Sequence, residues 1–232
     1  MKYIYISSFI KDNVFSFVGI LVLNLKAIIL MPIIIKSLGV EIYGSYVLLV
    51  SSLSIIYGVS SLGVGLSAKR YLPSAPSEED RQKLFLPQFY FGLISILIVS
   101  GLMVQFNVQI KLHLFNDEIE YSPYLLPGYL IAYFFYSQGV DFFRYTSRIK
   151  YTVIGSTIYP YIHIGIILYL LYSASIININ TLVISEATAA FIIGVICFIK
   201  ILTEIKLRWV FFKLKELRTE INLGFPLTIK VM

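Results

Sequence analysis

Charged residues are scarce in this chain of 232 residues. Only 14% of them are Asp, Glu, Lys or Arg, whereas about a quarter of a soluble domain is charged. Apolar residues make up 58% of the sequence. A soluble protein of this length needs a polar surface that this composition does not supply. The sequence therefore predicts a membrane protein.

Cysteine, histidine and known catalytic motifs are almost absent. The single cysteine, Cys197, excludes an intramolecular disulfide framework and a multi-cysteine zinc site, and we expect it to be a small buried apolar residue. GxSxG, P-loop and HExxH sequences do not occur, and the two histidines lack metal-ligand spacing. We expect no metal, no cofactor and no enzymatic activity. The net charge of +6 is attributed to loops beside a membrane rather than to nucleic-acid binding.

Apolar residues gather in six blocks of about twenty residues, the length of a helix that crosses the hydrocarbon core. They lack the two-residue alternation of a transmembrane β-barrel. The blocks cover residues 14–35, 43–66, 87–108, 124–142, 152–173 and 181–203. We therefore expect an all-α membrane protein with a bundle of six transmembrane helices in residues 1–203.

Two further segments follow this bundle. Residues 204–220 mix basic and apolar side chains, which is typical either of an amphipathic helix on the cytoplasmic membrane surface or of a plain linker beside the membrane. Residues 221–232 resemble the start of a seventh apolar helix. The expected organisation is thus a six-helix bundle in residues 1–203, a cytoplasmic linker at 204–220 and the start of a seventh helix at 221–232.

Basic residues are distributed unevenly between the two sides of this bundle. Fifteen of the nineteen Lys and Arg residues fall in the N-terminal segment and in alternate loops, whereas the opposite loops hold only Lys36 and Lys111. Cytoplasmic loops of membrane proteins carry an excess of Lys and Arg. We therefore expect the amino terminus and the basic loops to lie in the cytoplasm.

One basic residue is predicted to lie deep in the membrane. Lys26 stands near the centre of the first apolar block, where a charge costs about 2.5–3.5 kcal/mol and has to face protein or a watery cavity. Two interpretations are open. Lys26 either pairs structurally with a carboxylate, or it lines a cavity and meets an anionic ligand such as a phosphate.

The fourth block ends in a polar stripe that consists of Gln138, Asp141, Tyr145 and Arg148 at helical spacing. Arg144 lies three residues after Asp141, so a local ion pair between them is the simplest interpretation. The alternative is that Arg144 and Arg148 form a cytoplasmic mouth that attracts phosphate.

Glu186, His163 and Tyr133 are three further candidate site residues within the apolar blocks. Glu186 is a candidate coupling-ion or proton site, as is Asp141, although Glu186 can also simply reach water at the external interface. His163 either binds a ligand or a proton, or is a hydrogen-bonded packing residue. The chain has 18 tyrosines, whose rings suit both helix ends and sugar-contacting cavities, and Tyr133 is the one we select as a cavity residue.

Small residues recur along one face of the second block, at spacings of three and four. This stripe predicts a close contact with another helix in a compact bundle. Its members are Ser51, Ser54, Gly58, Ser61 and Gly65.

Several loose motifs occur in an order and spacing that resemble a known family. The sequence LGVEIYGSY at 38–46 precedes a serine-rich helix, which ends in SLG at 61–63 and KRY at 69–71. A basic link, FRYTSRIKY, covers 143–151, and NLGFPL covers 222–227. Together they resemble the amino-terminal half of bacterial polysaccharide flippases, the Wzx-type O-antigen and capsule transporters of the MATE-like MOP superfamily.

This resemblance implies two six-helix lobes around a central cavity that opens alternately to the two sides of the bacterial cytoplasmic membrane. The implied cargo is a polyprenyl-diphosphate-linked oligosaccharide, which a cationic cavity would attract; Lys26 and Arg144 are candidates on physical grounds. A missing second lobe or a second copy of the chain would be the structural partner, with polysaccharide polymerase machinery as another. A drug or metabolite exporter of the same superfamily and a membrane-embedded polysaccharide enzyme are the alternatives.

Overall fold

The computed structural model describes residues 2–61, 69, 72–115, 120–173 and 177–205. Every regular element in this part of the chain is helical. The expected linker beyond Ile205, the start of a seventh helix and Gly65 lie outside the described residues. The helices are α1 (Lys2–Leu38), α2 (Val40–Ser60), the 3-10 helix η1 (Leu72–Ser74), α4 (Glu78–Gln105), α5 (Asn107–Phe115), α6 (Leu125–Tyr145), α7 (Ile149–Tyr172) and α8 (Ile179–Ile205).

Five of these helices, α1, α2, α4, α7 and α8, are long and apolar enough to cross a membrane. The prediction of an all-α fold is therefore confirmed for the described residues, and five helices have the length and composition of membrane crossings. Helix α6 occupies the fourth predicted block but is less apolar than the other five, because Gln138, Asp141 and Arg144 lie within it. It is also well enclosed, with eleven buried residues. The sixth crossing stays a prediction.

The helices extend beyond the apolar blocks at two places. Helix α4 begins at Glu78, well before residue 87, because Ser77 caps it by accepting a hydrogen bond from the Asp80 amide at 3.1 Å. Helix α1 begins already at Lys2. The short helix α5, which follows α4 after Phe106, was not predicted from the sequence.

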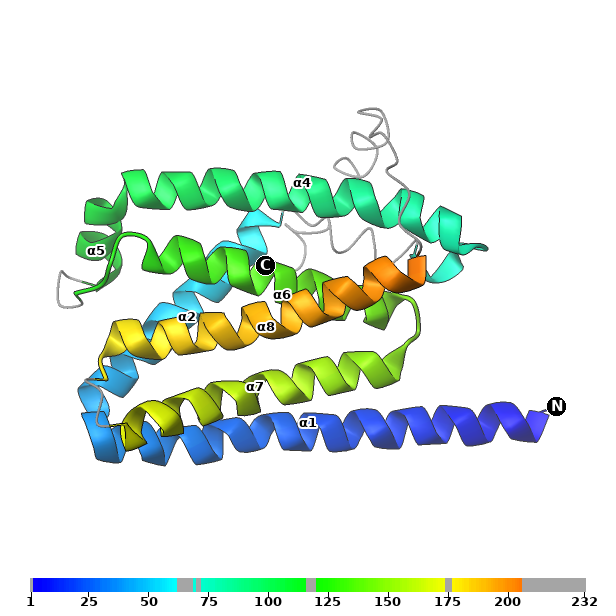
Figure 1. Ribbon diagram of the computed structural model, residues 1–232, viewed down its shortest axis with the longest axis horizontal. Coiled ribbons are helices and arrows are strands. Elements are labelled where there is room, and N and C mark those ends of the chain that lie inside the picture. Colours follow the sequence, from blue (N-terminus) through cyan, green and yellow to red (C-terminus); the bar gives the residue numbers. More distant parts are fainter. Residues whose placement is uncertain (1, 62–68, 70–71, 116–119, 174–176, 206–232) are drawn as a thin grey trace.

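Successive long helices alternate in direction. Figure 1 shows α4, α6, α8, α7 and α1 lying roughly side by side in this order, with α2 crossing obliquely. One residue, Gly39, joins α1 to α2. Its φ of 95° is a backbone conformation that suits glycine, so the chain reverses sharply there. The N-terminus, the α6–α7 connection and the end of α8 lie at one end of the bundle, and the α1–α2 turn and α5 at the other.

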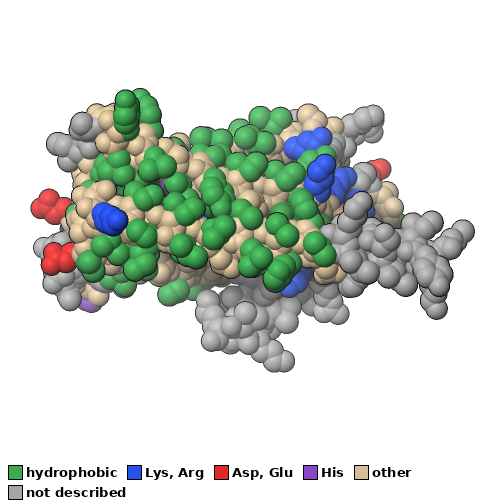
Figure 2. Space-filling view, turned by 90° about the horizontal axis from the view of Figure 1, so that it is seen from below, with side chains coloured by type: hydrophobic (Ala, Val, Ile, Leu, Met, Phe, Trp, Pro, Cys, Tyr) green, Lys and Arg blue, Asp and Glu red, His purple; other side chains and the backbone are tan. Residues whose placement is uncertain are grey.

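Side chains on the bundle surface follow this arrangement. Hydrophobic side chains cover the middle of the face in Figure 2, and most of its Lys and Arg residues lie towards one end. Lys36 and Lys111 belong to the opposite end, near the α1–α2 turn and in α5. The described members of the two groups of basic residues expected from the loop pattern are thus separated along the bundle.

Glycines of α6 and α8 make close contacts between these two helices. A Cβ atom placed on Gly194 would lie 2.7 Å from the Tyr136 backbone nitrogen, and one on Gly139 would lie 2.6 Å from the Cys197 Cβ. Cys197 is buried there, as expected. Small residues let membrane helices approach in this way, and α6 packs more extensively against α8 than any other described pair of helices does.

The small-residue stripe predicted to mediate such a contact on α2 does not do so among the described residues. Ser51 and Ser54 are exposed, and a Cβ on Gly58 would meet no atom within 4 Å. The prediction of a close helix contact at this stripe is therefore wrong for the described part of the chain, because the packed face of α2 lies elsewhere, at Tyr46, Leu49 and Leu53.

Candidate functional site

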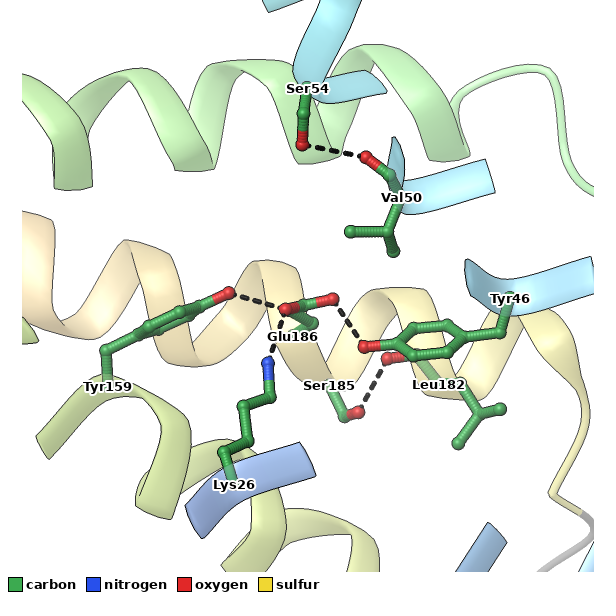
Figure 3. Close-up of polar contacts among 8 residues, drawn as sticks. All are labelled: Lys26, Tyr46, Val50, Ser54, Tyr159, Leu182, Ser185 and Glu186. Atoms are coloured by element: carbon green, nitrogen blue, oxygen red, sulfur yellow. Dashed lines mark hydrogen bonds and ion pairs between the residues drawn. The ribbon is translucent and has the colours of Figure 1, made fainter. Parts of the chain in front are cut away.

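A single buried carboxylate joins four helices. Glu186 on α8 accepts hydrogen bonds from the Lys26 ammonium on α1 at 2.7 Å, from the Tyr46 hydroxyl on α2 at 2.6 Å and from the Tyr159 hydroxyl on α7 at 2.6 Å. Figure 3 shows the three donors converging on the carboxylate from three sides. We call these four residues the Glu186 site.

Helical periodicity brings these side chains inward. Tyr46 shares the buried face of α2 with Leu49 and Leu53, at spacings of three and four. Glu186 follows the fully buried Leu182 by one turn of α8 and precedes Ala190 by another. The small side chain of Ala190 belongs to the same packed face, so the carboxylate lies inside the bundle.

Burial makes the charge balance of the site important. Glu186 is only 3% exposed, and an ionised carboxylate at such depth requires a cation and hydrogen-bond donors. Lys26 supplies the cation, and its ammonium also lies 5.2 Å from the centre of the Tyr159 ring, within cation–π distance. The interpretation that Glu186 reaches water at an interface is wrong, whereas the structural pairing of Lys26 with a carboxylate is confirmed.

Lys26 also lines a pocket, so the two interpretations of this residue are compatible. The pocket has a volume of about 240 Å³ and lies along α1 and α2. The Lys26 side chain is 19% exposed, while the Glu186 side chain is 4% exposed. The Lys26 ammonium thus contacts the buried Glu186 carboxylate, and the Lys26 side chain also lines the pocket. The lining residues are Lys26, Ala27, Leu30, Tyr43, Tyr46, Val47, Val50, Ser51 and Glu186.

His163 lies behind the same site. Its side chain is fully buried, and its ring centre is 6.3 Å from that of Tyr46. Among the described residues neither ring nitrogen has a hydrogen-bond partner. The prediction that His163 is a packing residue is therefore confirmed, but the described contacts of its ring are packing contacts and not hydrogen bonds.

Tyr133 is connected to the Glu186 site through a run of aromatic rings. It stacks on Tyr129 at 5.9 Å between ring centres, meets Tyr57 edge-on at 4.9 Å and lies 5.7 Å from Tyr136. Tyr136 in turn lies 4.6 Å from Tyr159. The selected tyrosine thus belongs to a polar aromatic layer between α2, α6 and α7, rather than to the pocket itself.

The other selected charges lie in a different part of the bundle. Arg144 forms an ion pair with Asp141 at 3.0 Å, which confirms the local pairing within α6. Arg144 also borders a second pocket of about 320 Å³ between α1 and α7. Arg148 immediately precedes α7. These residues do not line the Lys26 pocket, so the structure does not join them to Lys26 in one cavity.

Sequence reasoning missed Tyr46 and Tyr159 as site residues. Tyrosine is common in this chain, so the residue type gave no signal. The useful signal was that Lys26 and Glu186 are opposite charges inside apolar segments, where each requires a partner. Among the described residues, no group of three or more His, Cys, Asp or Glu side chains is arranged to hold a metal ion.

Comparisons with known proteins add no assignment. No protein-family model, no curated protein and no solved structure matches this chain. Function has to be argued from the site and from the resemblance in the sequence motifs.

Proposed function

We propose that this chain is the amino-terminal lobe of a transporter that flips a polyprenyl-diphosphate-linked oligosaccharide across the bacterial cytoplasmic membrane for surface polysaccharide synthesis. The observation that carries the proposal is the position of Lys26, a cation that faces a pocket from the middle of an apolar helix. An ionisable residue at this depth is costly even when it is paired, as Lys26 is with Glu186, and such residues typically mark a functional site. The cargo's diphosphate is an anion that has to pass the same depth of membrane.

The chemistry required of such a transporter agrees with the residues present. Flipping makes and breaks no covalent bond, so the site needs only to bind and release. Lys26 would attract the diphosphate, and the tyrosines between α2, α6 and α7 would contact sugars through ring faces and hydroxyls. Asp141 and Glu186 remain candidates for coupling to an ion or a proton.

The proposal includes six crossings, with α6 as the sixth. A helix of 21 residues is roughly 31 Å long, enough to cross the hydrocarbon core. Helices α4, α7 and α8 pack against α6, so its polar residues need not face lipid. In this topology the amino terminus and the basic end of the bundle are cytoplasmic, and a second lobe or a second copy of the chain completes the cavity.

Complementation tests the proposal. The natural reading frame that encodes this chain is expressed in a bacterium that lacks its own polysaccharide flippase, and surface glycan is measured. The test variant is Lys26→Gln combined with Glu186→Gln, which removes both charges and leaves neither unpaired. The control is Lys36→Gln, an exposed lysine on the same helix.

We expect the natural protein and the Lys36→Gln control to restore surface glycan, and the double variant to lose at least nine-tenths of it at equal membrane abundance. If all three proteins restore surface glycan, Lys26 is not required for transport. Absence of glycan with every protein, despite normal insertion, would contradict the flippase assignment for that glycan.

One observation favours the second candidate, a cation-coupled exporter of the same superfamily. Glu186 is a buried carboxylate at membrane depth, which is the kind of residue that binds a coupling cation. In an exporter the Glu186→Gln change would stop drug efflux from cells, and surface glycan would not change. Efflux and glycan measurements on the same variants therefore separate the two candidates.

A further inference from the structure

We infer that Glu186 is an internal competitor of the anionic ligand: its carboxylate occupies the three donors that a ligand's phosphate group would otherwise use, and it weakens anion binding in the natural protein. The inference rests on the proposed function in that it concerns the same pocket. It goes beyond it by assigning an autoinhibitory role to Glu186 and donor roles to Tyr46 and Tyr159.

The convergence of the donors is the first argument. One ammonium and two hydroxyls approach the two carboxylate oxygens of Glu186 to within 2.6–2.7 Å. Such charge-assisted hydrogen bonds are short and about twice as strong as neutral ones. Donors placed in this way bind an oxyanion in general, since phosphate oxygens accept the same hydrogen bonds. The molecule therefore contains a preformed anion site that is filled from within.

Access is the second argument. Lys26, Tyr46 and Glu186 all line the 240 Å³ pocket, so an anion that enters it meets the ammonium directly. This volume suits a phosphate or diphosphate group rather than an oligosaccharide. The ligand class that the pocket selects is thus a phosphate or diphosphate ester, whose remaining parts stay outside it.

Competition follows from the covalent attachment of the carboxylate. A group held beside its partner by the fold acts at a high effective concentration, of the order of millimolar or above. Among the described residues Lys26 forms its one ion pair with Glu186. A phosphate in the pocket therefore competes with this carboxylate for the Lys26 ammonium, and the apparent affinity of the phosphate falls accordingly.

Replacement of Glu186 by glutamine separates this account from a purely structural one. Glutamine has nearly the same shape but is neutral, and its amide nitrogen cannot accept a hydrogen bond. If the carboxylate is a competitor, Glu186→Gln frees Lys26 and tightens anion binding. If the carboxylate only holds the donors in place, the same change loosens them and weakens binding.

The experiment uses the full chain, purified and reconstituted in lipid nanodiscs, with inorganic pyrophosphate as the probe. Calorimetry at constant ionic strength gives the dissociation constant for the natural protein, Glu186→Gln, and the control Glu41→Gln. Glu41 is an exposed acid in the first turn of α2. Thermal unfolding in the same nanodiscs confirms that each protein is folded.

We expect Glu186→Gln to bind pyrophosphate at least tenfold more tightly than the natural protein, and Glu41→Gln to bind it as the natural protein does. Addition of Lys26→Gln to Glu186→Gln should abolish the gain. Glu186→Asp, whose carboxylate is one methylene shorter, should give an intermediate affinity and serves if the glutamine variant does not fold. Equal or weaker binding by folded Glu186→Gln or Glu186→Asp would overturn the inference.

Failure of this inference is distinguishable from failure of the proposed function. If Glu186→Gln binds pyrophosphate more tightly but the Lys26 variants do not change surface glycan, the inference about Glu186 stands and the proposed flippase function is wrong. If glycan transport depends on Lys26 but Glu186→Gln does not change the affinity for pyrophosphate, the proposed function stands and the inference about Glu186 is wrong.

Discussion

Helices α2 and α6 both have 21 residues, yet the structure uses them differently. Four residues of α2 are buried, compared with eleven of α6. The more apolar of the two, α2, is the more exposed, and the less apolar α6 is enclosed by α4, α7 and α8. In a membrane protein apolar side chains are as suited to lipid as to the interior. High hydropathy of a helix in this chain therefore does not by itself indicate that the helix is buried.

The two helices also differ in what holds them. Helix α6 meets α8 through glycine contacts at Gly139 and Gly194. Helix α2 packs less extensively against its neighbours, and a short hydrogen bond from Tyr46 to Glu186 is one of its links to α8. Polar contacts at the Glu186 site thus matter more for α2, whereas steric fit matters more for α6. Four substitutions test this difference.

The largest effect is expected for Lys26→Met. This change removes the cation and leaves the Glu186 carboxylate buried without its counter-ion, a situation that costs about 3–5 kcal/mol. Unfolding of the purified protein in mixed micelles measures the loss. The double variant Lys26→Met with Glu186→Gln should recover most of it, and a double variant as unstable as the single one would contradict the role of the ion pair.

Tyr46→Phe should have the next largest effect. The substitution keeps the ring but removes a hydrogen bond to a charged acceptor, which is worth about 1.5–3 kcal/mol. The same unfolding assay measures it, with Tyr124→Phe as the control because Tyr124 is 71% exposed. Equal stability of the two variants would show that the Glu186 site does not hold α2.

Gly194→Ala tests the steric side of the comparison. The added methyl would lie 2.7 Å from the Tyr136 nitrogen and 2.8 Å from the Phe135 carbonyl carbon, both backbone atoms. Overpacking of this kind costs about 1–3 kcal/mol. Gly58→Ala is the matched control on α2, where no atom lies within 4 Å, and its effect should be below about 1 kcal/mol. Reversal of this order would refute the packing difference.

Asp141→Asn should have the smallest effect. Its partner Arg144 is 57% exposed, and exposed ion pairs between neighbours on one helix contribute about 0.3–0.5 kcal/mol. We expect no change in unfolding beyond this value, and a reduced effect at high salt. A loss comparable with that of Lys26→Met would mean that the Asp141 pair has a larger structural role than its exposure indicates.

Local sequence patterns predicted much of the fold. The apolar blocks at 124–142 and 152–173 agree with α6 and α7 to within about three residues, because a segment that faces lipid has to satisfy its backbone internally as a helix. The start of α4 was misplaced because its first turns lie outside the apolar block, although Ser77 and Asp80 gave a capping signal.

The site was harder to predict because it depends on contacts between distant segments. Lys26 and Glu186 are 160 residues apart in the chain, and no local pattern says which helices are neighbours. The requirement that a deep charge be paired identified both residues but not their pairing. The α2 stripe failed for the same reason, since small residues permit a close contact without specifying that a neighbour is there.

Photocrosslinking in living cells tests the central claim most directly. A photoreactive amino acid replaces Val47, an exposed residue of the Lys26 pocket, and for comparison Ile196, an exposed residue of α8 that does not line it. The account predicts that lipid-linked oligosaccharide is captured from position 47 and not from position 196, and that the Lys26→Gln and Glu186→Gln double variant loses the product. Equal capture from both positions, or capture of ordinary phospholipid alone at position 47, would contradict it.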